Sequence, residues 1–313
     1  MSLSSEEFDE AYYLTAYPDV AAAISAGQFA SGQEHFSAFG RREGRLGSAS
    51  SLASVRAEVS AGAEANVSGR AYAAAFVWPT KHAGNPPPAA PPNDLQAFFD
   101  GRHEGRGIWK WRHYFNIYEK HFARFRGREV HVLEIGVFSG GSLDMWRDYF
   151  GPKVRLYGVD IEPACKAYES DTVRIFVGDQ ADRGFWSRFR TAVPRLDIVI
   201  DDGGHIYDQQ RVSLEELLPH LQLGGVYVCE DIHGEFHSFS SYLAGLAGML
   251  NQGEVTNHPD DNERRLASKT SPFQAAISSI SFYPQLVAIE KNPTPVNELV
   301  APKHGTQWQP FLR

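Results

Sequence analysis

The sequence has little cysteine, no long apolar run and no excess of basic residues. Its two cysteines, Cys165 and Cys229, are too few for a disulfide framework and too far apart for a zinc site, so we expect a reducing compartment. No segment approaches the roughly 20 apolar residues of a membrane span, and the N-terminus has acidic residues where a signal peptide is basic. The sequence therefore predicts a cytoplasmic protein that makes no contact with a membrane.

The charge balance is acidic. The 313 residues include 38 Asp and Glu against 30 Lys and Arg, which gives a formal net charge of −8. Proteins that bind polynucleotides neutralise phosphates with a basic patch or arm, and no such segment is visible. We expect no nucleic-acid partner, while a homo-oligomer is an option that the sequence leaves open.

Changes in composition divide the chain into four parts. Residues 1–47 carry aromatic and small apolar residues at helical spacings interrupted by proline and glycine, which predicts a small module of two or three short helices. Residues 48–95 are rich in serine and alanine and then in proline, which favours an extended linker. We assign residues 96–300 to the main domain and residues 301–313 to a C-terminal tail.

The main domain alternates short β-branched runs with amphipathic stretches, a pattern typical of a parallel sheet with helices on both faces. Seven strands are predicted, over residues 130–135, 155–160, 173–178, 197–201, 226–229, 279–282 and 286–290. A helix is predicted over residues 209–223, with Gly224 and Gly225 as its stop. Only three residues separate the last two strands, which must therefore be antiparallel. The predicted class is α/β, a Rossmann-like doubly wound sheet of seven strands with the last one antiparallel.

A glycine-rich turn follows the first predicted strand. Gly136 and Gly141 fit the first and last glycines of the dinucleotide-binding pattern, but Phe138 stands where the second glycine lets the backbone touch a pyrophosphate. This argues against NAD and is compatible with a nucleoside cofactor that has no phosphate. The alternative is a tight turn that only packs a helix on the strand.

Acidic residues end the next two strands. Asp160 is placed to accept hydrogen bonds from ribose hydroxyls, and Asp179 with Gln180 is placed to contact the edge of adenine. Each alone could also be a helix N-cap or a solvated turn residue. Their recurrence at successive strand ends favours a nucleoside site.

Two further strands end in pairs of carboxylates. Asp201 and Asp202 are followed by two glycines and His205, and Glu230 and Asp231 follow the next strand. Neighbouring strands lie about 4.8 Å apart, so these acids converge and repel one another unless a cation compensates them. Oxygen ligands favour Mg²⁺, with Mn²⁺ or Ca²⁺ as alternatives, and nearby histidines keep a transition metal open. The other interpretation is a pair of capped loops without an ion.

Together these motifs resemble those of the class I S-adenosylmethionine-dependent methyltransferases. Within that class they resemble the metal-dependent sugar O-methyltransferases of the macrocin and mycinamicin type. The resemblance covers roughly residues 110–291 and rests on Glu134-Ile-Gly-Val-x-x-Gly-Gly-Ser142, Asp201-Asp202-Gly-Gly-His205, Glu230-Asp231 and the closing segment 281–290. Separately, the pattern Tyr-Leu-x-x-x-Pro-Asp-Val near the N-terminus resembles a short module attached to bacterial surface-carbohydrate proteins.

The resemblance implies an enzyme that transfers a methyl group from S-adenosylmethionine to a sugar hydroxyl of a glycoside, nucleotide sugar or saccharide, with Mg²⁺, Mn²⁺ or Ca²⁺. It implies that Asp202, Glu230 and Asp231 are metal ligands, and that His205 is the general base. It places the cofactor against a set of residues in the glycine turn and at the strand ends: Glu134, Gly136, Gly140, Ser142, Asp160, Asp179, Gln180 and Asp201. Gly204 is a departure, because relatives often carry serine there.

Other functions stay open on the sequence alone. A cephalosporin hydroxylase-like protein or a nucleotide-cofactor oxidoreductase component uses the same kind of fold, and a non-catalytic carbohydrate-associated protein is a third option. Three aromatic residues on the segment entering the domain, Trp111, His113 and Tyr114, are candidates for covering the cofactor or the sugar, with simple packing as the alternative.

Overall fold

The computed structural model describes residues 8–40, 47–48, 91–233, 238–257, 266–302 and 304–305. The chain divides into two compact units, Met1–Pro91 and Pro92–Arg313. The predicted linker, residues 48–95, lies almost wholly outside the described residues, as does most of the predicted tail.

The first unit is helical. It contains α1 (Glu10–Ala16), α2 (Pro18–Ser25), α3 (Gly32–His35) and a π-helical turn, η1 (Phe36–Gly40). Asp9 caps α1 by accepting a hydrogen bond from the Tyr12 amide, and Ser31 caps α3 in the same way. Tyr13, Val20 and Phe36 form its buried core. Three short helices thus lie within the range of the predicted module, residues 1–47.

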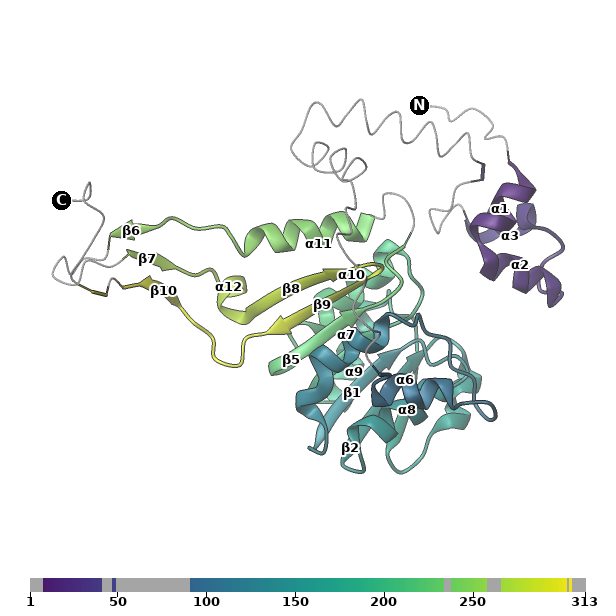
Figure 1. Ribbon diagram of the computed structural model, residues 1–313, viewed down its shortest axis with the longest axis horizontal. Coiled ribbons are helices and arrows are strands. Elements are labelled where there is room, and N and C mark those ends of the chain that lie inside the picture. The colour runs from purple at the N-terminus through teal and green to yellow at the C-terminus, as the bar shows by residue number, and fades with distance from the viewer. Residues whose placement is uncertain are drawn as a thin grey trace. The chain divides into compact units, whose positions relative to one another are not determined.

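A seven-stranded sheet forms the centre of the second unit (Figure 1). Its spatial order is β3-β2-β1-β4-β5-β9-β8. The strands are β1 (Val130–Ile135), β2 (Val154–Asp160), β3 (Val173–Val177), β4 (Leu196–Asp201), β5 (Leu221–Cys229), β8 (Ile277–Tyr283) and β9 (Leu286–Lys291). The pairs β1–β2, β2–β3, β1–β4 and β4–β5 are parallel, and β9 is antiparallel to both β5 and β8. The Rossmann-like sheet with an antiparallel last strand is confirmed.

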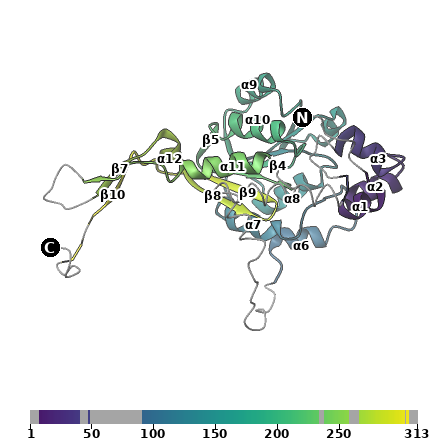
Figure 2. The same cartoon turned by 90° about the horizontal axis from the view of Figure 1, so that it is seen from above.

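Helices cover both faces of this sheet, and Figure 2 shows α9 and α10 on one side of the strands with α6 and α7 on the other. One face carries α6 (Asp94–Asp100), α7 (Tyr114–Phe122), the 3-10 turn η2 (Ala123–Phe125) and α8 (Gly141–Phe150). The other carries α9 (Arg183–Ala192), α10 (Tyr207–Leu217) and α11 (Ser238–Met249). A 3-10 helix, η3 (Pro163–Tyr168), follows β2. None of the helices within the described ranges is long and apolar enough to cross a membrane.

The predicted helix over residues 209–223 is wrong at its C-terminal end. Helix α10 stops at Leu217, and β5 already begins at Leu221. Pro219 has no amide hydrogen with which to continue the helix. Gly224 takes a φ of 74° within an irregularity of the β4–β5 ladder, so the glycines form a bulge in a strand instead of a helix stop. The other predicted strand limits fall within two residues of those observed.

A second, three-stranded sheet was not predicted. It consists of β6 (Thr256–Asn257), β7 (Leu266–Lys269) and β10 (Glu298–Ala301), in the order β10-β7-β6. Its strands are two to four residues long, too short for an alternating pattern to be visible in the sequence. A short helix, α12 (Pro272–Ala276), begins with a capping box made by Ser271 and Gln274.

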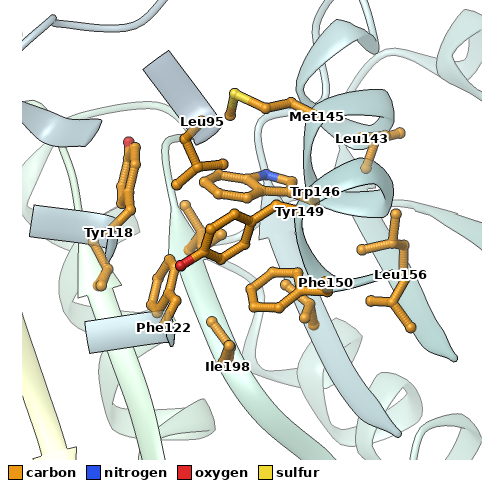
Figure 3. Packing of buried hydrophobic residues seen from close by; sticks show 14 of the residues in the cluster. Leu95, Tyr118, Phe122, Leu143, Met145, Trp146, Tyr149, Phe150, Leu156 and Ile198 are labelled. Carbon is orange, nitrogen blue, oxygen red and sulfur yellow. The ribbon is translucent and has the colours of Figure 1, made fainter. Parts of the chain in front are cut away.

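Aromatic side chains fill the core on the α7 and α8 face (Figure 3). Tyr118 and Phe122 stack with their ring centroids 5.7 Å apart, and both rings meet the edge of Trp146. Phe150 closes the cluster against Phe122 and Trp146. This packing fixes α7 against α8, and α7 supplies side chains to the candidate site.

Phe150→Ala should lower the free energy of unfolding by about 3–5 kcal/mol, because a fully buried ring is replaced by a cavity. Phe282→Ala is the matched control, because Phe282 is half exposed on β8. This substitution should lower the free energy of unfolding by less than about 1 kcal/mol. Urea unfolding followed by circular dichroism measures both. Equal losses in the two variants would contradict the assigned core.

Candidate functional site

The sheet register brings two acidic motifs to one edge. Ile135 pairs with Asp201, and Asp201 pairs with Cys229, so β1, β4 and β5 end side by side. The Asp202 amide donates to the Ile135 carbonyl at 3.0 Å, and the Glu230 amide donates to the Asp201 carbonyl at 2.8 Å. The backbone thus stays hydrogen-bonded to the neighbouring strand as far as Asp202 and Glu230, the residues that carry the carboxylates.

Asp160 shapes the glycine turn. Its Oδ2 accepts the amides of Val137 and Phe138 at 2.9 and 3.0 Å, so the carboxylate faces the backbone of the turn. Gly136 has a φ of 87°, and a Cβ there would overlap the carbonyl oxygen of Asp202. Phe138, at a φ of 46°, leaves its ring 73% exposed at the end of β1. The turn is therefore open on its outer side.

Glu134 and Ser142 join β1 to α8. Glu134 is buried and accepts hydrogen bonds from the Ser142 hydroxyl at 2.7 Å and from Trp146 Nε1 at 3.1 Å. Burial raises the pKa of Glu134, and the ammonium of Lys110 opposes this rise. Gly140, with a φ of 73°, approaches the ring of Tyr168 too closely for a Cβ. These residues form the wall behind the turn.

Gln180 holds the loop that follows β4. It is buried, and its Nε2 donates to Asp201 Oδ1 and to the Ser213 hydroxyl, both at 3.1 Å. Its Oε1 accepts the Gly204 amide at 2.7 Å. Asp179 is exposed and accepts the amide of Ala181. The structure therefore separates these two neighbours, with Gln180 inside the loop and Asp179 outside it.

Asp201 points away from the exposed edge. Its Oδ2 accepts the Tyr227 hydroxyl at 2.8 Å, and its side chain is buried. Burial raises the pKa of Asp201 to about 6, although the hydrogen bonds from Tyr227 and Gln180 favour the charged form. Asp201 thus holds the loop after β4 from its buried side.

Asp202, His205 and Asp231 gather at the exposed edge. One ligand atom from each lies within 4.8 Å of the others, and all three side chains are half-buried. His205 Nε2 is 3.9 Å from Asp202 Oδ1 and 3.7 Å from Asp231 Oδ2. His205 and Asp231 have φ angles of 52° and 53°, a left-handed backbone that is uncommon outside glycine and often found at functional sites. Two carboxylates and one imidazole are a donor set for a cation.

Glu230, the third predicted ligand, lies deeper than this group. Its Oε1 accepts the Tyr118 hydroxyl at 2.6 Å, and its Oε2 accepts Lys110 Nζ at 2.9 Å. Burial raises the pKa of Glu230, and the positive charge of Lys110 acts against that rise.

The sequence reasoning missed Lys110 and Tyr118. Both reach the acids from α7 or the segment just before it, where a lone lysine between tryptophans carries no recognisable signal. The Tyr114 and Tyr118 pair, four residues apart, places two hydroxyls on one helix face and was the only available hint.

Trp111 and Tyr114, predicted as covering residues, contact a predicted metal ligand. Trp111 Nε1 donates to Asp231 Oδ1 at 3.0 Å, and the Tyr114 hydroxyl lies 2.8 Å from the same oxygen. The Tyr114 hydroxyl also lies 3.0 Å from the carbonyl of Gln285, in the turn between β8 and β9. That carbonyl accepts the Ile232 amide as well, so the turn borders the site.

The fold and the strand-end acids together define the class. The class I methyltransferase fold has a glycine turn after β1, acids after the following strands and a reversed last strand, as seen here. The comparisons with known proteins confirm the predicted resemblance. No model of a known protein family matches the chain.

Within this class the chain is similar to sugar O-methyltransferases. It is 38% identical over 149 residues to 8-demethyl-8-(2-methoxy-alpha-L-rhamnosyl)-tetracenomycin-C 3'-O-methyltransferase of Streptomyces olivaceus, covering 45% of this chain and 36% of that protein. It is 32% identical over 236 residues to the 8-demethyl-8-alpha-L-rhamnosyl tetracenomycin-C 2'-O-methyltransferase of the same organism, covering 66% and 60%. The chain thus spans less than two thirds of these relatives.

A solved structure is also similar to this chain in fold and sequence. MycE methyltransferase from the mycinamycin biosynthetic pathway, in complex with Mg, SAH and mycinamycin VI, matches with a TM-score of 0.51 and 29% identity. The match covers 64% of this chain and 53% of that protein.

Gly136→Ala should lower the free energy of unfolding by more than about 2 kcal/mol, because its Cβ overlaps the Asp202 carbonyl and its φ is positive. Gly245→Ala is the control. Gly245 lies in α11 with open space around it, so alanine should stabilise the protein by about 0.5–1 kcal/mol. Chemical denaturation of both variants tests this, and two similar changes would argue against the close approach of the turn to the loop after β4.

Proposed function

We propose that this chain is an S-adenosylmethionine-dependent, divalent-metal-assisted O-methyltransferase that acts on a sugar hydroxyl of a small-molecule glycoside or saccharide. The observation that carries the proposal is the grouping of Asp202, His205 and Asp231 beside the glycine turn of a methyltransferase fold. The named relatives at 32–38% identity support it.

The donor set fits a hard divalent ion such as Mg²⁺. Asp202 and Asp231 offer carboxylate oxygens at the half-buried edge, and oxygen ligands are those that Mg²⁺ prefers. Glu230 stays in the proposed ligand set, because a carboxylate oxygen that accepts a hydrogen bond with one lone pair keeps another for an ion. The ion, when bound, acts as a Lewis acid that lowers the pKa of a coordinated hydroxyl.

The cofactor is assigned to the open side of the turn. S-adenosylmethionine, when bound, supplies a methyl group bonded to a positively charged sulfonium sulfur. We assign Asp160 to its ribose and exposed Asp179 to its adenine, and we place Gly136 and Gly140, which shape the turn, beside its methionine part. The other predicted cofactor residues are assigned to the wall and loop that border the turn: Glu134, Ser142, Gln180 and Asp201.

His205 is the proposed general base. Its Nε2 lies between Asp202 and Asp231 at 3.9 and 3.7 Å, so a hydroxyl oriented by these acids comes within its reach. A neutral imidazole nitrogen can accept the hydroxyl proton as the oxygen attacks the methyl carbon. The Gln180 contact to the Gly204 amide fixes the loop that carries this ring.

The sugar acceptor is supported by the two tetracenomycin-C methyltransferases to which the chain is similar, because the substrates in their names carry rhamnosyl groups. We also propose that the enzyme works in the cytoplasm, because Cys165 and Cys229 are both buried free thiols.

Chelation should abolish methyl transfer. Incubation with EDTA and removal of the chelate should reduce transfer from radiolabelled S-adenosylmethionine to a panel of glycosides and nucleotide sugars to background, and Mg²⁺ should restore it. Full transfer after exhaustive chelation would show that no metal takes part.

Thermal stabilisation by NAD but not by S-adenosylmethionine would favour the oxidoreductase alternative.

His205→Ala should lower kcat by about 10²–10⁴-fold, the usual contribution of a general base, while the Kd for S-adenosylmethionine changes by less than about threefold. His103→Ala, at an exposed histidine before α7, is the control and should leave kcat unchanged. Steady-state kinetics and calorimetry provide the two numbers. A His205→Ala enzyme with normal kcat would exclude this residue as the base.

A further inference from the structure

Lys110 is a buried cation inside the acidic cluster. Its side chain is 2% exposed, and its Nζ lies 2.6 Å from Asp202 Oδ2 and 2.9 Å from Glu230 Oε2. Glu134 Oε1 lies 3.8 Å away. Two carboxylate oxygens at salt-bridge distance favour the charged form of the amine, so the side chain is an ammonium held in place by the acids.

The residues that follow Lys110 in the chain hold this segment against the site. Trp111 is tied to Asp231 at 3.0 Å, and the His113 ring contacts the Pro284 carbonyl at 3.0 Å. Helix α7 then begins at Tyr114, whose hydroxyl also reaches Asp231. Lys110 thus cannot withdraw from the acids without disturbing several hydrogen bonds.

The ammonium contacts two of the three proposed metal ligands. Within the described part of the chain, no other lysine or arginine pairs with Asp202 or Glu230. The carboxylates that converge here outnumber this single positive charge: Glu134, Asp202, Glu230 and Asp231. After pairing with one ammonium, the carboxylates still carry enough negative charge to bind one divalent ion. The ammonium nevertheless repels that ion, because both positive charges contact the same carboxylate.

We propose that Lys110 is a built-in cation that shares the carboxylates of Asp202 and Glu230 with the divalent ion. It weakens binding of the ion and holds the two acidic motifs together when the ion is absent. This inference rests on the proposed metal-assisted function. Because the buried carboxylates always have one positive partner, the site forms before the ion arrives, and the ion exchanges more readily.

The test measures Mn²⁺ binding by calorimetry and thermal unfolding with and without Mn²⁺, using the full chain and no cofactor or acceptor. The variants are Lys110→Met, which keeps the unbranched chain one atom shorter and without its charge, and Lys120→Met. Lys120 is exposed on α7, the helix that follows Lys110, and hydrogen-bonds to the Tyr283 hydroxyl instead of to the acids, so it is the matched control.

Lys110→Met should bind Mn²⁺ about tenfold more tightly than the unmodified protein, because the competing charge is gone. Without Mn²⁺ it should melt at a lower temperature, because its buried carboxylates lack a partner, and Mn²⁺ should raise its Tm by more than it raises that of the unmodified protein. Lys120→Met should behave as the unmodified protein in both measurements.

Two results overturn the inference: a Lys110→Met protein that binds Mn²⁺ no more tightly, or one that stays unfolded at saturating Mn²⁺. If methyl transfer is abolished by chelation while the two Mn²⁺ affinities are equal, this inference fails and the proposed function stands. If neither protein binds Mn²⁺, both fail. Binding by Lys110→Met alone supports the role of Lys110 and contradicts metal assistance in the unmodified protein.

Discussion

The site depends on the compensation of like charges at one edge of a parallel sheet. Carboxylates that follow β4 and β5 are forced together by the strand spacing, and burial makes each charge costly unless an opposite charge or a donor meets it. The ammonium of Lys110 and the hydroxyls of Tyr118 and Tyr227 meet the inner oxygens. The outer oxygens of Asp202 and Asp231 stay at the half-exposed edge, where an ion and a hydroxyl can reach them.

Backbone conformation sets the second condition. The turn after β1 passes so close to the Asp202 carbonyl that only glycine fits at position 136, and the loop after β4 is held by the amide of Gly204 on Gln180. Asp160 closes the turn from the neighbouring strand. The proposed cofactor side and the proposed metal side are therefore braced by the same two loops, which keeps the methyl donor and the acceptor in a constant relation.

Much of this arrangement is legible in the sequence, because it depends on local patterns. Alternating β-branched runs placed the strands, and acids directly after them marked the edge. The strand limits of β5 were misjudged, because Gly224 serves a bulge as readily as a helix stop. Lys110 and Tyr118 were missed, because their contacts with Glu230 span 120 and 112 residues and leave no local pattern. The inward orientation of Gln180 and Asp201 likewise depends on tertiary packing.

The reversed last strand has an effect beyond closing the sheet. Because β9 runs against its neighbours, its connection to β8 lies at the same edge as the acids, and the Gln285 carbonyl accepts from both Ile232 and Tyr114. Asp231 is therefore oriented by a segment before β1 and by the turn after β8, with six of the seven strands of the sheet between them in sequence. A chain that stops short of this turn carries every acid of the site and still lacks the carbonyl that holds the loop after β5, so the last turn of the sheet completes the candidate site.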